Sequence, residues 1–236
     1  MNDFYNTTKL SVKIFRIQIA KTIQRFAVIA CFAGLSIFCK AQSSDFHPYF
    51  SFGTSHGVSF SSINFYPAVV QQQLMGYYGG IAANYVSEKC FGLQVELNYS
   101  QRGWKEQATA GTFQRRLNYF EMPVLTHFYL GNKFRWMLNF GPKIGYLLSE
   151  SSQNAVASSS HEEYTMPIAN KFDYGFCVGT GFELCAGSTS YTLEGRYSFG
   201  LSDIFPNSKK DTFGSSGNKF VSITLGVFLH FPARQH

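Results

Sequence analysis

Two short stretches of this chain combine residue types that could bind a metal ion or activate a nucleophile. His161-Glu162-Glu163 offers an imidazole and two carboxylates, which are donors for divalent cations, but we interpret it as a solvated loop segment. Thr126 and His127 place a hydroxyl beside a base, as a lipid-modifying hydrolase would need. Adjacent residues of a strand point to opposite faces, so this pair cannot work together, and we interpret His127 as structural. We therefore predict no catalytic residue, no metal site and no cofactor.

A second set of polar residues is charged and lies inside apolar stretches. The set consists of Glu96, Glu121, Lys143, Glu183, Glu194 and Arg196. A charge that is removed from water needs a partner of opposite charge or several hydrogen bonds. The elements that carry these six residues therefore decide what they can do.

Residues 133–148 show most clearly what kind of secondary structure carries these charged residues. Large apolar side chains alternate there with Arg135, Met137, Asn139, Gly141, Lys143 and Gly145. A period of two predicts a single β-strand with two different faces. The alternation lasts about fourteen residues, which is long for a globular protein and enough to cross a bilayer at a tilt.

Seven further stretches repeat this pattern, and the connections between them differ in length. The eight predicted strands are residues 49–60, 75–86, 91–103, 114–130, 134–148, 171–184, 191–201 and 219–231. Short connections at 87–90, 131–133 and 186–189 alternate with longer polar ones at 61–74, 104–113, 149–170 and 202–218. Outer-membrane barrels have this asymmetry. We predict an all-β fold, a closed antiparallel up-and-down transmembrane β-barrel of about eight strands.

The faces of these strands have a defined direction in such a barrel. A charge facing lipid at the membrane midplane costs about 2–4 kcal/mol, so the charged face must line the lumen. Because unpaired backbone groups are costly in hydrocarbon, the sheet must close, and side chains just fill an eight-stranded interior. Aromatic residues near the strand ends are expected to form interfacial girdles. These are Tyr99, Trp104, Tyr119, Tyr129, Phe134, Trp136, Tyr146 and Tyr191.

The six charged residues then form a predicted polar network inside the lumen. If the 131–133 turn sets the register, Glu121 faces residues 142–143, which predicts an ion pair with Lys143. Glu96, Glu194 and Arg196 are expected to form another layer nearer the periplasm. We favour a network that only fills the barrel, and keep open a proton or ion path, since charges buried in membranes are often functional.

The N-terminal segment has the features of a signal peptide. A basic region ends at Arg25, an apolar stretch covers residues 26–38, and cleavage is predicted after Ala41. Residues 1–41 are therefore assigned to the signal peptide and residues 42–236 to the barrel domain. A lipoprotein signal at Cys39 and a retained amphipathic N-terminal helix are the alternatives.

The net charge of +6 belongs almost entirely to this leader. Six basic residues and one acidic residue precede position 42, so the rest of the chain carries a charge of only +1. Nucleic-acid-binding proteins carry a basic surface in the folded domain. We therefore predict no nucleic-acid partner.

Four sequence blocks resemble a known family. They are FGLQVELNYSQRG at 91–103, LNYFEMPVL at 117–125, NFGPKIGYLL at 139–148 and RYSFGL at 196–201. Together they resemble the PorT-like outer-membrane β-barrel family of Bacteroidetes, a group of outer membrane protein beta-barrel domains. The resemblance implies a barrel of about eight strands without known catalytic residues, and the family's namesake takes part in type IX protein secretion.

We therefore expect an integral protein of the cell outer membrane with a non-enzymatic structural, interaction or secretion-accessory role. Its expected partners are outer-membrane lipid, including lipopolysaccharide, and secretion or surface proteins. Two alternatives are a membrane-embedded enzyme that modifies lipid or peptide and a soluble lipocalin-like barrel. A lipocalin-like barrel would place apolar residues inside and polar residues outside.

Overall fold

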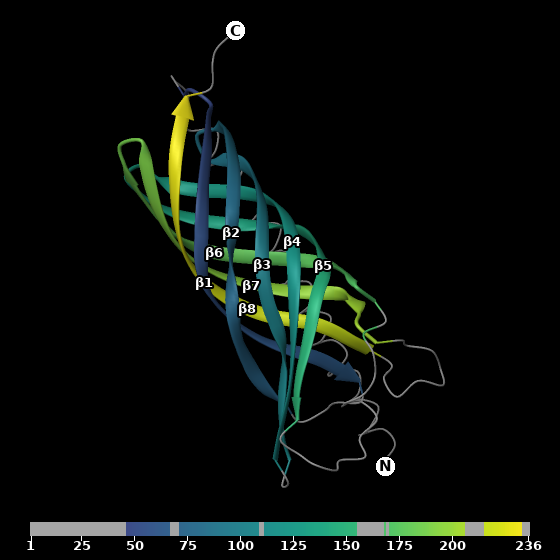
Figure 1. The fold of residues 1–236 in the computed structure, drawn as a ribbon. Helices are drawn as coiled ribbons and strands as arrows, with labels where there is room; N and C mark the ends of the chain where they lie inside the picture. The colour runs from purple at the N-terminus through teal and green to yellow at the C-terminus, as the bar shows by residue number, and fades with distance from the viewer. Residues whose placement is uncertain are drawn as a thin grey trace, which may run out of the picture. The chain divides into compact units, whose positions relative to one another are not determined.

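Eight β-strands account for most of the described residues (Figure 1). The computed structural model describes residues 46–66, 71–108, 111–154, 168, 170–205 and 215–232. The strands are β1 (Tyr49–Tyr66), β2 (Gln72–Glu88), β3 (Phe91–Ala108), β4 (Gly111–Gly131), β5 (Phe134–Asn154), β6 (Phe172–Ala186), β7 (Thr189–Asp203) and β8 (Ser215–Pro232). The predicted signal peptide and the His161-Glu162-Glu163 segment lie outside the described residues.

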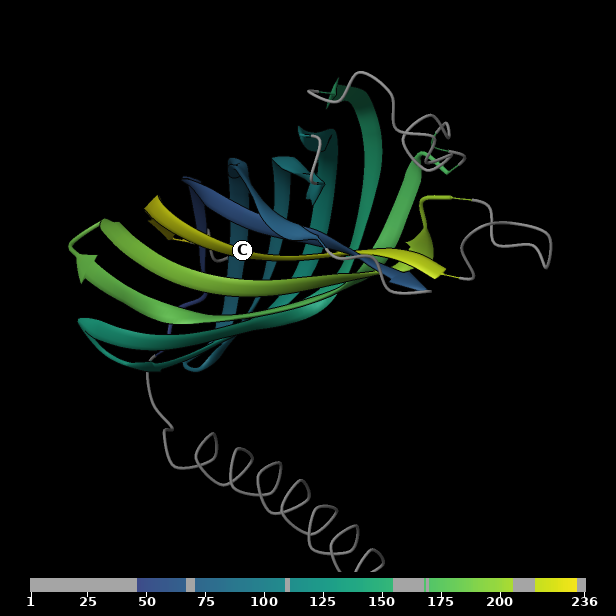
Figure 2. The same ribbon diagram turned by 90° about the horizontal axis from the view of Figure 1, so that it is seen from below.

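Each strand pairs antiparallel with the next strand along the chain, and β1 pairs antiparallel with β8 to close the sheet. Figure 2 shows this ring from below, with β1 beside β8. Closure leaves no sheet edge, so backbone hydrogen bonding is satisfied within the barrel. The predicted all-β closed antiparallel barrel of about eight strands is confirmed. No helix among the described residues is long and apolar enough to cross a membrane.

The two ends of the barrel carry different connections. At the short-turn end, which holds the β2–β3, β4–β5 and β6–β7 connections, only two residues separate consecutive strands. Gly131 (φ 120°) and Gly187 (φ 65°) have backbone conformations there that other residues rarely adopt. At the opposite loop end, the predicted long connection 104–113 is wrong, because β3 continues to Ala108 and β4 begins at Gly111. The described residues of this connection are paired as parts of β3 and β4, up to Ala108 opposite Gly111.

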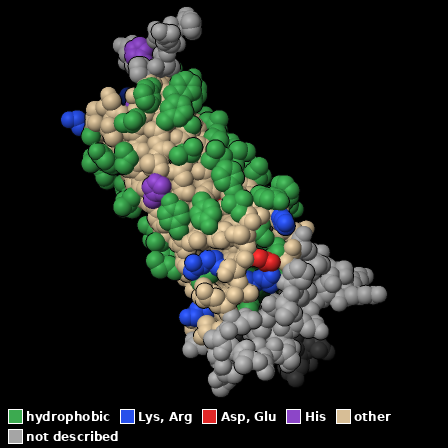
Figure 3. All heavy atoms as spheres, viewed as in Figure 1, with side chains coloured by type: hydrophobic (Ala, Val, Ile, Leu, Met, Phe, Trp, Pro, Cys, Tyr) green, Lys and Arg blue, Asp and Glu red, His purple; other side chains and the backbone are tan. Residues whose placement is uncertain are grey.

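The outer wall is apolar and the interior of the middle of the barrel is polar. Figure 3 shows hydrophobic side chains over the visible wall and Lys and Arg side chains toward its ends. Trp136, Phe140 and Leu225 are 37–66% exposed on the outer face. Glu121 and Lys143 are only 1–2% exposed inside. This polarity is the opposite of a lipocalin-like barrel.

Three of the aromatic residues expected at the interfaces lie inside the barrel instead. Trp104, Tyr119 and Tyr129 are at most 2% exposed. Trp104 has the same parity in β3 as the inward Glu96, and the two tyrosines share the parity of Glu121 in β4, so the strand pleat turns all three inward. Trp104 and Tyr119 belong to a buried group at the loop end, which we call the apolar cap. Its members are Ile63, Phe65, Trp104, Phe113, Leu117, Tyr119, Leu147, Ile204 and Phe205.

Candidate functional site in the barrel lumen

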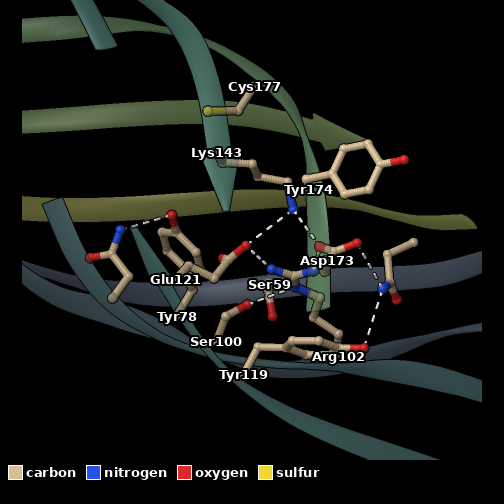
Figure 4. A network of polar contacts seen from close by, with 12 residues as sticks. Ser59, Tyr78, Ser100, Arg102, Tyr119, Glu121, Lys143, Asp173, Tyr174 and Cys177 are labelled. Carbon is tan, nitrogen blue, oxygen red and sulfur yellow. Dashed lines mark hydrogen bonds and ion pairs between the residues drawn. The ribbon is translucent and has the colours of Figure 1, made fainter. Parts of the chain in front are cut away.

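Four charged side chains meet at the centre of the lumen, and we call them the central ion cluster (Figure 4). They are Arg102 on β3, Glu121 on β4, Lys143 on β5 and Asp173 on β6. Lys143 Nζ lies 3.0 Å from Glu121 Oε1 and 3.0 Å from Asp173 Oδ2. Arg102 Nη1 lies 2.7 Å from Asp173 Oδ2, and its Nη2 contacts Glu121. Two cations thus face two anions in a site where each side chain is at most 2% exposed.

Neighbouring strands add hydrogen bonds and aromatic faces to this cluster. Ser202 on β7 donates to Asp173 Oδ1 at 2.9 Å, and Asn218 on β8 donates to the same oxygen at 3.3 Å. The Arg102 guanidinium lies 4.4 Å from the ring centre of Phe220 and 4.6 Å from that of Tyr119. Side chains from β3 to β8 therefore converge on one point, and loss of one charge would leave the others without compensation.

The register that positions Glu121 and Lys143 differs from the predicted one. Glu121 lies opposite Gly145, and Lys143 lies opposite Pro123, so the two side chains meet diagonally. The β4–β5 connection sets Gly131 opposite Arg135, which shifts the pairing by about two residues from the expected one. A shift of two keeps every side chain on its own face, so both residues still point inward.

A second group, the arginine cluster, lies nearer the short-turn end. Arg196 Nη1 and Nη2 donate to the two carboxylate oxygens of Glu96 at 2.7 Å each, and its Nε donates to Glu194 at 2.9 Å. This bidentate geometry is the strong form of an arginine–carboxylate contact. Asn98 donates to Glu96 at 2.6 Å, and Gln94 also donates to it. Several donors therefore hold two carboxylates against one guanidinium.

A glycine makes room for the arginine cluster. A Cβ atom at Gly179 would lie 2.1 Å from Glu194 Oε1. No side chain fits at that position unless the carboxylate moves.

Glu183, the remaining predicted network residue, belongs to neither cluster. It pairs with Arg135 at 3.3 Å, close to the short-turn end. A small cavity of about 10 Å³, lined by Glu183 and by Glu96 and Glu194 of the arginine cluster, has room for about one water molecule. His127 lines it and contacts Asn139 at 2.7 Å between Nδ1 and Oδ1. His127 is thus inside the barrel, as the alternation requires.

Two members of the central ion cluster were not among the predicted network residues. Arg102 and Asp173 fall at the ends of their predicted strands, beside stretches interpreted as loops. Their positions in the alternating pattern could have identified them. Arg102 is an even number of residues from Glu96, and Asp173 is an even number from Glu183, so each shares the inner face of its strand. Which cation contacts which anion depends on closure of the barrel.

A polar group on the outer wall was also missed. Thr54 and His56 are two residues apart on β1, and Thr54 Oγ1 lies 2.7 Å from His56 Nε2. Tyr77 on β2 contacts His56 Nδ1 at 2.5 Å through its hydroxyl. Thr54 Oγ1 also donates to the Gly80 carbonyl at 2.7 Å. The three side chains contact one another on a part of the outer wall whose neighbours, including Phe52, Ile81 and Leu225, are apolar.

Several solved outer-membrane barrels are similar to this chain in structure. OprG from Pseudomonas aeruginosa is 10% identical with a TM-score of 0.49, and the match covers 79% of this chain and 98% of OprG. Neisserial surface protein A is 12% identical with a TM-score of 0.44, covering 76% and 97%. Ail of Yersinia pestis is 11% identical with a TM-score of 0.41, covering 77% and 98%. Likenesses at this level carry no conclusion about function.

Sequence comparison gives a family but no individual relative. Comparison with curated proteins yields no match. The family model described as the outer membrane protein beta-barrel domain matches residues 40–206, which is more than half of the chain. The protein therefore belongs to the outer membrane protein beta-barrel domain family, and its barrel lies in the cell outer membrane.

Proposed function

We propose that this barrel is a non-enzymatic outer-membrane protein that acts through its two ends, as an interaction or secretion-accessory protein. The observation that carries the proposal is the closed lumen. The four residues of the central ion cluster are at most 2% exposed. Toward the loop end the apolar cap follows, with Trp104 packed against Phe65 and Phe205. Side chains fill the lumen both at the central ion cluster and at the apolar cap. This favours a function carried out by the two ends of the barrel over transport of a solute through it.

Conductance in a planar lipid bilayer tests the closed lumen. The purified protein is expected to insert without a stable conductance, because paired charges and packed rings occupy its interior. The matched variant is Trp104→Ala with Phe205→Ala, which opens the cap but leaves the central ion cluster in place, and it should stay silent too. A steady ohmic conductance in the unmodified protein would contradict the proposal.

The finer proposal is a PorT-like role in type IX protein secretion in a member of the Bacteroidetes. Its support is the set of four sequence blocks in β3, β4, β5 and β7. These blocks supply residues of the two ion clusters, including Glu96, Arg102, Glu121, Lys143 and Arg196. A deletion strain should lose secretion of type IX cargo and regain it with the complete gene. Unchanged secretion in the deletion strain would exclude this version and leave the closed barrel untouched.

Basic side chains at the loop end support lipopolysaccharide as a lipid partner. Lys105 and Arg116 lie on neighbouring strands β3 and β4, on the outer face and beyond the apolar wall. Phosphate groups attract such side chains. Replacing both residues by Glu should reduce retention of the barrel on lipopolysaccharide-containing vesicles, but leave retention on neutral phospholipid vesicles unchanged.

Hydrolysis of a membrane lipid is a second candidate, favoured by the Thr54–His56–Tyr77 group. A hydroxyl, an imidazole and a third group that orients the imidazole are the elements of nucleophilic catalysis. An apolar groove of about 360 Å³, lined by Phe52 and Ile81 among others, lies beside it. It ranks second because His56 pairs with Leu225 in the middle of the apolar wall, whereas lipid esters lie at the membrane surface. Gly80 also accepts the Thr54 hydroxyl proton.

Lipid analysis separates the two candidates. If the group is catalytic, deletion changes the lipid profile, and the unmodified gene restores it while His56→Ala and Thr54→Ala do not. His127→Ala is the matched control, since His127 lies in the lumen away from lipid. An unchanged profile in the deletion strain leaves only the non-enzymatic function.

A further inference from the structure

Three side chains of metal-ligating type come together inside the short-turn end of the lumen. Glu183 and Cys185 lie on β6, and His230 lies on β8. One carboxylate oxygen, the Sγ atom and one imidazole nitrogen all lie within 4.8 Å of one another. Neither cluster described above uses Cys185 or His230.

The local fold holds these three side chains on one surface. Glu183 and Cys185 are two residues apart, so their side chains share the inner face of β6. The β6–β7 turn then approaches β8, where the His230 amide donates to the Ser188 carbonyl at 2.8 Å. Gly187, with its positive φ, keeps this turn tight. The two strands that carry the ligands are therefore connected by backbone hydrogen bonds through β7 and the β6–β7 turn.

The imidazole at this site lacks the partners that a buried ring normally has. Both ring nitrogens of His230 are buried, and neither has a hydrogen-bond partner among the described residues. The ring of Tyr49 packs edge-on against it at 5.1 Å between centroids. A buried nitrogen without a partner is unfavourable, and a ligand at that point would remove the penalty.

The other two donors are available as well. Cys185 is a free thiol and is partly exposed. Glu183 receives a bond of 3.3 Å from Arg135, whose guanidinium also donates to the Tyr49 hydroxyl at 3.0 Å and the Asn132 carbonyl at 2.9 Å. Arg135 thus keeps two other acceptors if the carboxylate turns to a cation.

We propose that Glu183, Cys185 and His230 form a binding site for a divalent transition-metal ion, with zinc as the best match. Thiolate, imidazole and carboxylate are zinc ligands at about 2.0–2.3 Å, whereas Mg²⁺ and Ca²⁺ select oxygen donors. Closure by about 1 Å through side-chain rotation brings the donor atoms to tetrahedral spacing. Metal binding converts the Cys185 thiol to thiolate and releases its proton to water. Three protein ligands leave a fourth position for water.

This site was not predicted from sequence because its spacing is not local. Glu183 and Cys185 are close in the chain, but His230 is on a strand that reaches them only through β7. Zinc motifs in sequences normally contain two closely spaced pairs of Cys or His ligands. This chain has only Glu183 and Cys185 close together, so no such motif can be recognised.

Metal titration of the full protein tests the proposal. The protein is purified from membranes in detergent without a histidine tag, and Zn²⁺ is added in competition with a chromophoric chelator. One Zn²⁺ per chain is expected, and Cys185→Ser and His230→Gln should each weaken binding roughly tenfold or more. Co²⁺ in place of Zn²⁺ should give a thiolate-to-metal charge-transfer band that Cys185→Ser abolishes.

Matched controls use the same residue types elsewhere in the lumen. Cys177→Ser and His127→Gln should bind Zn²⁺ like the unmodified protein, because both residues lie outside the site. Heat-dependent gel mobility shows that each variant still forms the barrel. The proposal is overturned if the unmodified protein binds no stoichiometric Zn²⁺, if both site variants retain its affinity, or if a control variant weakens binding as much. These outcomes do not depend on the proposed secretion role.

Discussion

The two halves of β4 have opposite polarity. Toward the loop end the inward positions include Phe113 and Leu117, and the outward positions between and after them are Gln114, Arg116 and Asn118. From Phe120 onward the pattern reverses. Glu121 and His127 then point inward, and apolar residues such as Phe128 point outward. The same strand therefore has a soluble-protein arrangement at one end and a membrane arrangement over the rest.

The difference shows that the surroundings of the wall decide what fills the lumen. Where lipid covers the outside, apolar side chains are already placed there, and the interior is left to paired charges such as Glu121 and Lys143. Where water covers the outside, the apolar residues turn inward and pack as the apolar cap. The reversal next to Tyr119 marks the level at which β4 leaves the hydrocarbon.

Removing the guanidinium from the arginine cluster should have the largest effect. Arg196→Met leaves Glu96 and Glu194 buried together without their cation, and is expected to cost about 5 kcal/mol of unfolding free energy. Urea unfolding of the barrel in lipid vesicles measures this. The triple variant with Glu96→Gln and Glu194→Gln should recover most of the loss. If it recovers nothing, Arg196 acts by packing and not by charge.

Opening the apolar cap should cost somewhat less, and for a different reason. Trp104→Ala removes a side chain that is 1% exposed and leaves a cavity, at an expected cost of about 4 kcal/mol. Trp104→Phe keeps most of the ring volume and should cost clearly less in the same urea measurement. An equal loss in both variants would point to the Trp104–Glu106 hydrogen bond as the main contribution.

A charge placed on the outer wall locates the membrane boundary. Leu225→Lys puts an ammonium group in the middle of the apolar face of β8 and should cost about 2–4 kcal/mol. Asn118→Lys puts the same group on the outer face of β4 above the reversal and should cost about 0–1 kcal/mol. Equal costs at the two positions would mean that the polarity reversal does not mark the edge of the hydrocarbon.

Adding one methyl group inside the arginine cluster should have the smallest effect of the four. Gly179→Ala forces the Glu194 carboxylate to move and should cost about 1–3 kcal/mol. Gly195→Ala is the matched control on β7, because the nearest atom to its Cβ would be 4.0 Å away, and it should change the stability little. Equal costs would show that the space at Gly179 is not what positions Glu194.

Much of the fold and part of the lumen could be predicted from sequence, because parity along a strand is a local property. It places Glu121, Lys143 and Arg196 inside the barrel and Phe140 outside it. The same parity also places Arg102 and Trp104 inside. Arg102 falls within the predicted strand 91–103, but the polar residues that follow led to a predicted loop at 104–113, which contains Trp104. Strand ends are therefore the part that local pattern predicts least well.

The sequence by itself determined the barrel and the direction of its faces, since a period of two and tight turns act over a few residues. Only the tertiary structure decided which charges meet. The observed β4–β5 register differs by about two residues from the one predicted from the turn. Closure of the barrel brings Arg102 of β3 against Asp173 of β6. The pairing of β7 with both β6 and β8 brings His230 of β8 to Cys185 of β6. Such contacts depend on the closed ring of strands, which no local pattern specifies.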